Sequence, residues 1–430
     1  MSTKQNKSNV VAIITMFFMF AMISFVTNMA APFGNIWKTH YEWSGMLGNL
    51  MNFAAYLIMG IPAGKLLIKI GYKRTALIAL LVGFIGIAVQ FASSYLPVGM
   101  TALVVYLFGA FICGFCVCML NTVVNPMLNT LGGGGNKGNQ LIQTGGALNS
   151  LSGTLTPLLA GAMIGTITKQ TAMSQVRPLL IIALVVFAVS FLILYLVAIP
   201  EPAASRSQID PNDKHSAWSF RHLVLGVIAI FFYVGIEVGI PGELNFYLSS
   251  PDANGAGLGE GAAVIGGAIA AVYWLLMLVG RLTSSALSSK VSPKAQLTFV
   301  SSLAILLCAV AIFLPSAIQI SMPGFANGHF TMMQVPMCAL FLVLCGLCTS
   351  LMWGAIFNLA VEGLGKYTEQ ASGIFMMMVV GGGIMPFCQD WIARNLGYMN
   401  SYWLVIAMLA FILYYALWGS KNVNKNIKVD

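Results

Sequence analysis

The chain has 430 residues, of which 58% are hydrophobic and only 8% are charged, and its formal net charge is +9. Soluble domains carry about 25% charged residues. So few charges cannot cover a water-facing surface, so the composition excludes a soluble enzyme or binding module. Most of the chain must instead face lipid or other helices.

Twelve segments are long and apolar enough to be membrane helices, which need about 20 mainly apolar residues. The first exceeds the roughly 7–15 apolar residues of a cleaved signal. The polar stretch 200–221 separates six segments from six. We therefore predict an N-terminal bundle at 1–199, a cytoplasmic linker at 200–221 and a C-terminal bundle at 222–430. The helices are predicted at 10–33, 47–70, 75–95, 100–130, 139–167, 178–199, 222–249, 261–288, 296–315, 334–362, 370–394 and 399–419.

The basic residues are distributed unevenly between the loops on the two sides of these helices. With the N-terminus placed in the cytoplasm, 17 of the 21 Lys and Arg fall on the cytoplasmic side. Cytoplasmic loops of membrane proteins carry such an excess. Both termini are therefore predicted to be cytoplasmic, and the positive charge indicates topology rather than binding to nucleic acid.

The two halves of the chain share a short motif. The stretch from Cys113-Gly-Phe-Cys116 to Leu131-Gly132 recurs as Cys345-Gly-Leu-Cys348 to Leu364-Gly365. In the same way, Gly64-Lys65 recurs as Gly280-Arg281. Matches in register between the halves favour parallel six-helix repeats, which place a substrate between them near the middle of the membrane.

Enzyme and cofactor motifs give no support for catalysis. The glycine-rich run 132–138 lacks the Gly-Lys-Ser/Thr ending of a phosphate loop, and it joins two predicted membrane helices. Each Cys-x-x-Cys lies in an apolar helix without a His partner, whereas structural zinc needs four ligands. We therefore predict no catalytic residue, no metal site and no cofactor.

Polar residues inside the first-half helices are candidates for binding, because their burial in lipid is costly unless they face a cavity or a partner. Asn121 and Asn125 lie four residues apart and share one helix face. Asn149, in the next helix, lies at about the same depth as Asn121, roughly 15 Å from the loop that joins the two helices. Paired carboxamides can both donate to and accept from a hydroxyl-rich ligand. The alternative is a hydrogen bond between helices.

The helix predicted at 222–249 carries Tyr233, Glu237 and Asn245 on one face. Glu237 is about 15 residues from the start of this helix. A carboxyl group at that depth suits reversible protonation, so Glu237 is the candidate for ion coupling. The alternative is a structural acid with a permanent partner. Further along the chain, Asp390 and Arg394 are predicted to form a local ion pair.

The basic residues nearest the membrane core lie at predicted helix ends. Lys65 and Arg281 are placed at inner ends and Arg394 at an outer end. An acidic sugar would be expected to meet a basic group inside the cavity, so a neutral sugar is favoured. We predict that Lys65, Lys73, Arg74 and Arg281 act in the opening and closing of the cytoplasmic side.

Several motifs together resemble the fucose:proton symporter family of the major facilitator superfamily, and its glucose/galactose transporters most. The similarity runs in order from the first to the eleventh predicted helix. The resemblance implies the major facilitator fold, with two six-helix bundles, and uptake of a monosaccharide by alternating access. The motifs are Asn125-Pro126, Ala147-Leu-Asn149-Ser150-Leu, Tyr233-Val-Gly-Ile-Glu237-Val, Tyr273-Trp274, Gly280-Arg281, Leu359-Ala-Val-Glu362-Gly-Leu-Gly365 and Ser372-Gly373 through Val380-Gly381-Gly382 to Pro386 and Gln389.

At two positions where a proton-coupled member of this family has a carboxylate, this chain has an amide. A proton-coupled member carries an Asp four residues before a Pro in the first helix, where this chain has Asn28 before Pro32. It also carries a Glu four residues before the Asn-Pro pair, where this chain has Asn121. Amides do not titrate, so proton coupling at these two sites is not transferred to this chain. Coupling then depends on Glu237 or on another ion, or is absent.

We predict an all-α membrane protein that imports a neutral or N-acetylated monosaccharide together with protons or sodium. Sugar uniport and symport of an acidic sugar such as sialic acid are the alternatives. A membrane receptor is less favoured because no long loop is predicted. The protein is expected in the lipid bilayer of a bacterial inner membrane, as a monomer. Its predicted substrate-binding residues are Asn28, Asn121, Asn125, Asn149, Tyr233, Glu237, Asn245, Trp274, Asn358 and Gln389.

Overall fold

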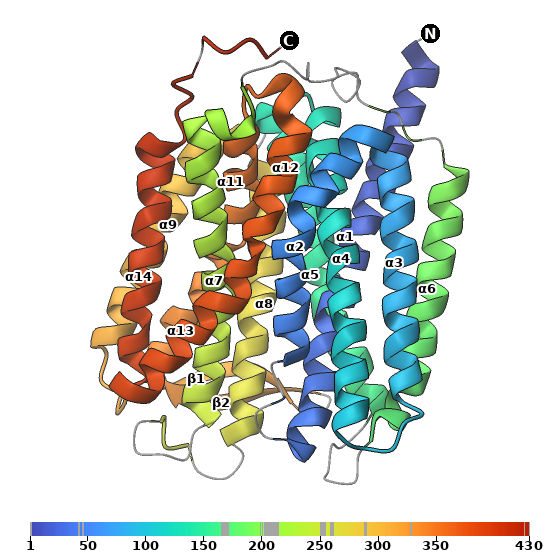
Figure 1. Ribbon diagram of the computed structural model, residues 1–430. Helices are drawn as coiled ribbons and strands as arrows, with labels where there is room; N and C mark the ends of the chain where they lie inside the picture. The colour runs from blue at the N-terminus through green and yellow to red at the C-terminus, as the bar shows by residue number, and fades with distance from the viewer. Residues whose placement is uncertain are drawn as a thin grey trace. The chain divides into compact units, whose positions relative to one another are not determined.

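The computed structural model describes residues 2–41, 44, 47–164, 172–197, 199, 201, 215–249, 255–258, 262–287, 290–326, 329–424 and 426–429. The chain forms two compact units, each built from long helices (Figure 1). Unit 1 contains residues 1–220, 361–380 and 424–430, and unit 2 contains 221–360 and 381–423. The predicted division at the linker 200–221 stays a prediction, and most of that linker lies outside the described residues.

Within the described residues, unit 1 contains six α-helices from the first half of the sequence and one short α-helix from the second half. Its helices are α1 (Ser2–His40), α2 (Leu47–Ile70), α3 (Tyr72–Ser93), α4 (Met100–Leu131), α5 (Gly135–Ile164), α6 (Arg177–Leu196) and α12 (Thr368–Met377).

The described part of unit 2 contains seven α-helices and a two-stranded sheet. Its elements are α7 (Arg221–Ser249), α8 (Ala262–Leu287), α9 (Pro293–Phe313), β1 (Gln319–Ala326), β2 (His329–Pro336), α10 (Met337–Thr349), α11 (Met352–Val361), α13 (Gly381–Leu396) and α14 (Tyr398–Tyr414).

Each of the twelve predicted segments is helical over most of the residues that the structure describes. Within those residues, eleven spans are long and apolar enough to cross a membrane. The one remaining predicted segment, 139–167, corresponds to α5. This helix of 30 residues is richer in glycine and polar residues than the eleven spans. The prediction of a helical membrane protein is therefore confirmed. Residues 165–167 of that segment lie outside the described residues.

Two predicted helices are interrupted. The segment 334–362 divides at Ser350 and Leu351 into α10 and α11. The segment 370–394 divides at a 3-10 turn, Met378–Val380, into α12 and α13. Three consecutive glycines follow this turn, and glycine is a poor helix former. The interruption matters because α12 belongs to unit 1 and α13 to unit 2.

The structure adds one two-stranded sheet to the predicted helical fold. Strands β1 and β2 pair antiparallel, with Ser321 opposite Gln334, whose amide donates to the Ser321 hydroxyl at 3.1 Å. The structure also begins α10 at Met337, after β2, whereas the helix was predicted from residue 334. A sequence signal for this hairpin was present, because Asn-Gly at 327–328 between two runs of strand-forming residues favours a tight turn.

Glycines bring α2 and α12 into close contact within unit 1, where the two helices run side by side (Figure 1). A Cβ added to Gly60 would lie 2.5 Å from the backbone nitrogen of Met377, and one added to Gly373 would lie 2.6 Å from the carbonyl oxygen of Gly60. Small residues permit this approach of two helix backbones. Beside it, the Ser372 hydroxyl donates to the Thr122 carbonyl on α4 at 3.1 Å.

The start of α1 and the C-terminal residues 426–429 lie at one end of unit 1, the upper end in Figure 1. The Lys366 amide donates to the Val429 carbonyl at 3.0 Å, which fixes the C-terminal segment near the start of α12. A common side for the two termini agrees with the predicted topology. Which side of the membrane this is stays a prediction.

Candidate substrate and coupling site

The main charged cluster inside unit 2 lies between α7 and α8. Glu237 Oε1 accepts a hydrogen bond from the Tyr233 hydroxyl at 2.9 Å and from Arg281 Nη2 at 3.0 Å. The side chains of Arg281 and Glu237 are only 9% and 15% exposed. A buried ion pair needs such additional hydrogen bonds to offset its desolvation. Glu237 therefore has two hydrogen-bond partners in this state.

Local sequence explains how Arg281 comes to this position. Gly280 packs against the Ser350 side chain and the Leu347 carbonyl, so α8 approaches α10 where a larger residue would not fit. The interruption of the helix at Ser350 leaves the Ser350 carbonyl available, and Arg281 Nε donates to it at 3.1 Å. The structure thus places Arg281 against Glu237 rather than at a solvent-facing helix end, where we had expected a gating residue.

Aromatic rings surround this cluster. The rings of Tyr233 and Trp353 meet edge to face with centroids 6.2 Å apart, and Tyr273 meets Trp274 in the same way at 5.5 Å. The Tyr273 hydroxyl shares a 2.8 Å hydrogen bond with Thr349. Trp274 and Trp353 are partly exposed. A carboxylate next to partly exposed indole rings can accept hydroxyl hydrogen bonds while the rings contact apolar C–H surface.

The other predicted site residues of unit 2 lie in separate places. Asn245 Oδ1 accepts from the Ser249 hydroxyl at 3.1 Å and lies against Gly266 of α8. Asn358 is buried in α11. Gln389 of α13 is fully buried, and its Nε2 donates to the Ser401 hydroxyl at 3.4 Å.

In unit 1, Asn121 and Asn125 form one buried chain of hydrogen bonds. Asn121 Nδ2 donates to the Tyr56 hydroxyl on α2 at 2.9 Å. Asn125 Nδ2 donates to the Asn121 carbonyl at 2.9 Å and to Asn121 Oδ1 at 3.4 Å. Asn125 is completely buried, and Asn121 is 6% exposed. Asn125 thus supports Asn121, which is bound to α2 in this state.

Asn28 and Asn149 lie together along the contact between α1 and α5. Asn149 Nδ2 donates to the Phe20 carbonyl at 3.0 Å. Asn28 Nδ2 donates to the carbonyl and to the hydroxyl of Ser24, at 2.9 and 3.0 Å. It packs over Gly153, one turn after Asn149. Both residues are partly exposed, and the hydrogen bond of Asn149 joins α5 to α1.

Tyr56→Phe tests the Asn121 contact. Removing the phenol oxygen leaves a buried amide N–H without its partner, which costs about 1–3 kcal/mol. We expect a loss of unfolding free energy of this size in detergent, together with weaker sugar binding if Asn121 contacts the sugar. Tyr95→Phe is the control, because the Tyr95 ring is exposed. An unchanged stability of Tyr56→Phe would show that Asn121 finds another partner.

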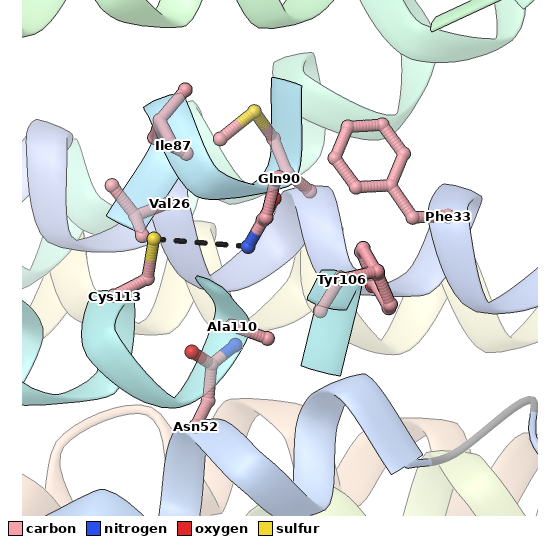
Figure 2. A pocket seen from close by; sticks show the side chains of 10 residues that line it. Val26, Phe33, Asn52, Ile87, Gln90, Tyr106, Ala110 and Cys113 are labelled. Atoms are coloured by element: carbon pink, nitrogen blue, oxygen red, sulfur yellow. Dashed lines mark hydrogen bonds between the residues drawn. The ribbon is translucent and has the colours of Figure 1, made fainter. Parts of the chain in front are cut away.

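A small cavity lies among α1, α2, α3 and α4, lined by Asn52, Gln90 and Tyr106 among apolar neighbours (Figure 2). Gln90 Nε2 donates to Cys113 Sγ at 3.7 Å. Asn52 Oδ1 and the Tyr106 hydroxyl are buried without a hydrogen-bond partner in the residues described. The cavity has room for about one water molecule. It is therefore too small for a sugar, and none of the predicted site residues lines it.

The predicted gating residues of unit 1 differ in their surroundings. Lys73 Nζ donates to the carbonyls of Tyr195 and Val197 at the end of α6, at 2.8 and 2.7 Å. Its backbone amide donates to Glu201, whose carboxylate also accepts from the Tyr72 amide. This carboxylate covers the positive end of α3. Lys65 and Arg74 are exposed, and the gating role stays a prediction for all of them.

Sequence reasoning missed three buried polar residues. Tyr56 is the partner of Asn121, and an aromatic residue in an apolar helix gave no distinctive signal. Glu369 of α12 is 2% exposed and accepts from the Tyr72 hydroxyl at 3.4 Å. Glu243 of α7 is also 2% exposed. For the two acids the signal was available, since a carboxyl group within a membrane helix is a candidate by default.

Comparison with known proteins identifies the family. Residues 10–386 match the Major Facilitator Superfamily model. The chain is 32% identical to a glucose/galactose transporter of Brucella abortus over 95% of its own length and 93% of that protein. It is 28% identical to a putative glucose/galactose transporter of Helicobacter pylori, over 97% and 99% of the two chains. It is 22% identical to the L-fucose-proton symporter of Escherichia coli, over 93% and 90%.

Solved structures share the fold. A crystal structure of a single-residue variant of the E. coli fucose:proton symporter superposes with a TM-score of 0.78 at 19% identity, covering 96% of this chain and all of that chain. A proton:xylose symporter superposes with a TM-score of 0.70 at 11% identity, covering 96% and 97%. The predicted fold and family are confirmed, and the relatives are transporters rather than enzymes. The chain is therefore an integral, multi-pass membrane protein that belongs to the Major Facilitator Superfamily.

Proposed function

We propose that this protein imports a neutral monosaccharide by alternating access, in symport with a proton, as a monomer in a bacterial inner membrane. The relatives named for glucose, galactose and fucose support the sugar class, because the similarity spans nearly the whole of each chain. The name of the fucose relative supports the proton. The feature of this chain that carries the proposal is the cluster of Tyr233, Glu237 and Arg281.

The charges of this cluster favour a neutral substrate. Glu237 and Arg281 neutralise each other at 3.0 Å. An acidic sugar would add a negative charge that the pair does not balance, and a buried uncompensated charge is costly. A neutral sugar adds no charge, and its hydroxyls can use the remaining acceptor capacity of the Glu237 carboxylate.

The same cluster provides a physical route to coupling. Asn28 and Asn121 cannot titrate, whereas Glu237 can. When Glu237 binds a proton, Arg281 loses its negative partner and the hydrogen bonds of the cluster must rearrange. A ligand shifts a conformational equilibrium only through different affinities for the two states. A proton on Glu237 would provide such a difference, because it changes the net charge around Arg281.

Sugar uptake into proteoliposomes tests this coupling. One positive charge moving down about 100 mV supplies roughly 2.3 kcal/mol, which corresponds to about 50-fold accumulation. We expect wild-type protein to concentrate labelled galactose or glucose under an inward proton gradient, and Glu237→Gln only to equilibrate it. Accumulation that follows a sodium gradient instead would disprove proton coupling. Equilibration without accumulation by the wild type would indicate a uniporter.

A further inference from the structure

A second carboxyl group on α7 is buried without a hydrogen-bond partner for one of its oxygens. Glu243 is 2% exposed, and its Oε2 makes no hydrogen bond to any residue that the structure describes. Buried polar atoms are nearly always paired, so an exception requires an explanation. Glu243 lies six residues after Glu237, or about 9 Å along the helix, and the cluster around Arg281 makes no described contact with it.

A second unpaired acceptor lies on the neighbouring helix. Gln389 of α13 is fully buried, and its Oε1 has no partner among the described residues. A Cβ added to Gly239 would clash with this oxygen. Gly239 is one turn before Glu243, and helical side chains lean over the turn that precedes them. The Glu243 carboxyl group is therefore directed toward the side of α7 on which the Gln389 amide lies.

The surrounding charges do not compensate an ionised Glu243. The charged groups that act on it are Asp390 and Arg394 of α13, and the nearby titratable group of α14 is Tyr402. Asp390 and Arg394 form an ion pair at 2.6 Å and so neutralise each other. The Tyr402 hydroxyl donates its proton to the Ile240 carbonyl at 3.0 Å, so it does not donate to Glu243. An ionised Glu243 would leave one net negative charge within a membrane-spanning helix, which is expensive.

We propose that Glu243 is a proton-binding site, and that its protonated carboxyl group donates a hydrogen bond to Gln389 Oε1. One proton turns the unpaired oxygen of Glu243 into a donor, which satisfies both orphaned acceptors and removes the uncompensated charge. A metal cation would need more ligands than these two oxygens, and no group of three or more metal-binding side chains occurs among the described residues. The role of this site in transport is to hold a proton at a fixed place on α7. That role rests on the proposed proton symport.

Infrared spectroscopy of the full-length protein in lipid tests this assignment directly. We expect the wild type at neutral pH to show the C=O band of a protonated carboxylic acid that is lost in Glu243→Gln. The exposed acid Glu362 provides the matched control, and Glu362→Gln should retain the band. In Gln389→Leu the band should persist at higher frequency, because the hydrogen bond to the amide is lost. This variant also tests the proposal should Glu243→Gln fail to fold.

The contrary outcomes are distinct. Identical carboxylic-acid bands in wild type and Glu243→Gln would show that Glu243 is ionised and overturn the proposal. A Glu243 band that disappears when sodium is added would replace the proton site by a sodium site. A band unaffected by Gln389→Leu would overturn the proposed hydrogen bond. Because the spectrum does not depend on sugar uptake, a failure of the sugar transport proposal would leave these readouts unchanged.

Discussion

Arg281→Gln is expected to destabilise the protein by about 3–5 kcal/mol, the usual cost of removing one partner of a buried ion pair. Stability is lost because Glu237 keeps its charge and its place but loses Arg281. Among the described residues, Arg281 is the cation that Glu237 contacts, at 3.0 Å. The interaction of Arg281 with the Ser350 carbonyl is lost as well. We expect sugar transport to fall together with stability. Chemical unfolding in detergent and uptake into proteoliposomes measure the two effects.

Two variants separate the ion pair from general damage. Glu237→Gln/Arg281→Gln removes both charges, so it should be more stable than Arg281→Gln alone. Arg394→Gln breaks an ion pair whose Arg side chain is 74% exposed, and exposed pairs contribute only about 0–1 kcal/mol. If the losses of the Glu237 and Arg281 variants simply added in the double variant, the two side chains would not depend on each other and the account of the cluster would be wrong.

Gly60→Ala is expected to reduce transport strongly through the contact of α2 with α12. The added Cβ would lie 2.5 Å from the Met377 nitrogen and 2.6 Å from its Cα. Backbone atoms cannot turn aside as a side chain can, so the two helices must separate. Overpacking costs about 1–3 kcal/mol, which changes the population of the state described here by roughly 5- to 150-fold. Transport by alternating access needs each state to be reached in every cycle.

The population change is measured by the reactivity of a cysteine in the contact. Ser372 of α12 is fully buried, so Ser372→Cys in a background without other cysteines should react slowly with a soluble maleimide. We expect Gly60→Ala to accelerate this reaction. Gly267→Ala is the control, since a Cβ on Gly267 meets no atom within 4 Å. Equal labelling rates with and without Gly60→Ala would show that the α2–α12 contact tolerates the methyl group.

Hydropathy predicted the helices well because each had to be long and apolar to cross a membrane. It did not predict the interruptions at Ser350 and at Met378–Val380, because the residues there are as apolar as the helices around them or are followed by glycines, which hydropathy does not distinguish. Arg281 illustrates the limit. Counting residues along α8 gives the depth of Arg281 in the membrane. The direction of its long side chain, however, depends on the close approach of Gly280 to α10.

The candidate site was predicted in part. The spacing of Tyr233 and Glu237 correctly placed them on one face, and their hydrogen bond confirms it. The Asp390–Arg394 pair was likewise confirmed. The partners of Asn121 and Glu237 come from other helices, so no spacing within one helix could indicate them. The hairpin β1–β2 and Glu243 were missed although the sequence carried a signal for each.

Counterflow tests sugar transport most directly, because it needs no ion gradient. Proteoliposomes loaded with unlabelled galactose are diluted into a trace of labelled galactose, with glucose and fucose examined in the same way. A carrier that binds the sugar alternately from the two sides should accumulate label transiently inside, well above the level in liposomes without protein. We predict this transient for at least one of the three sugars. Label that never exceeds the protein-free level with any of them would contradict the assignment of a neutral monosaccharide as the substrate.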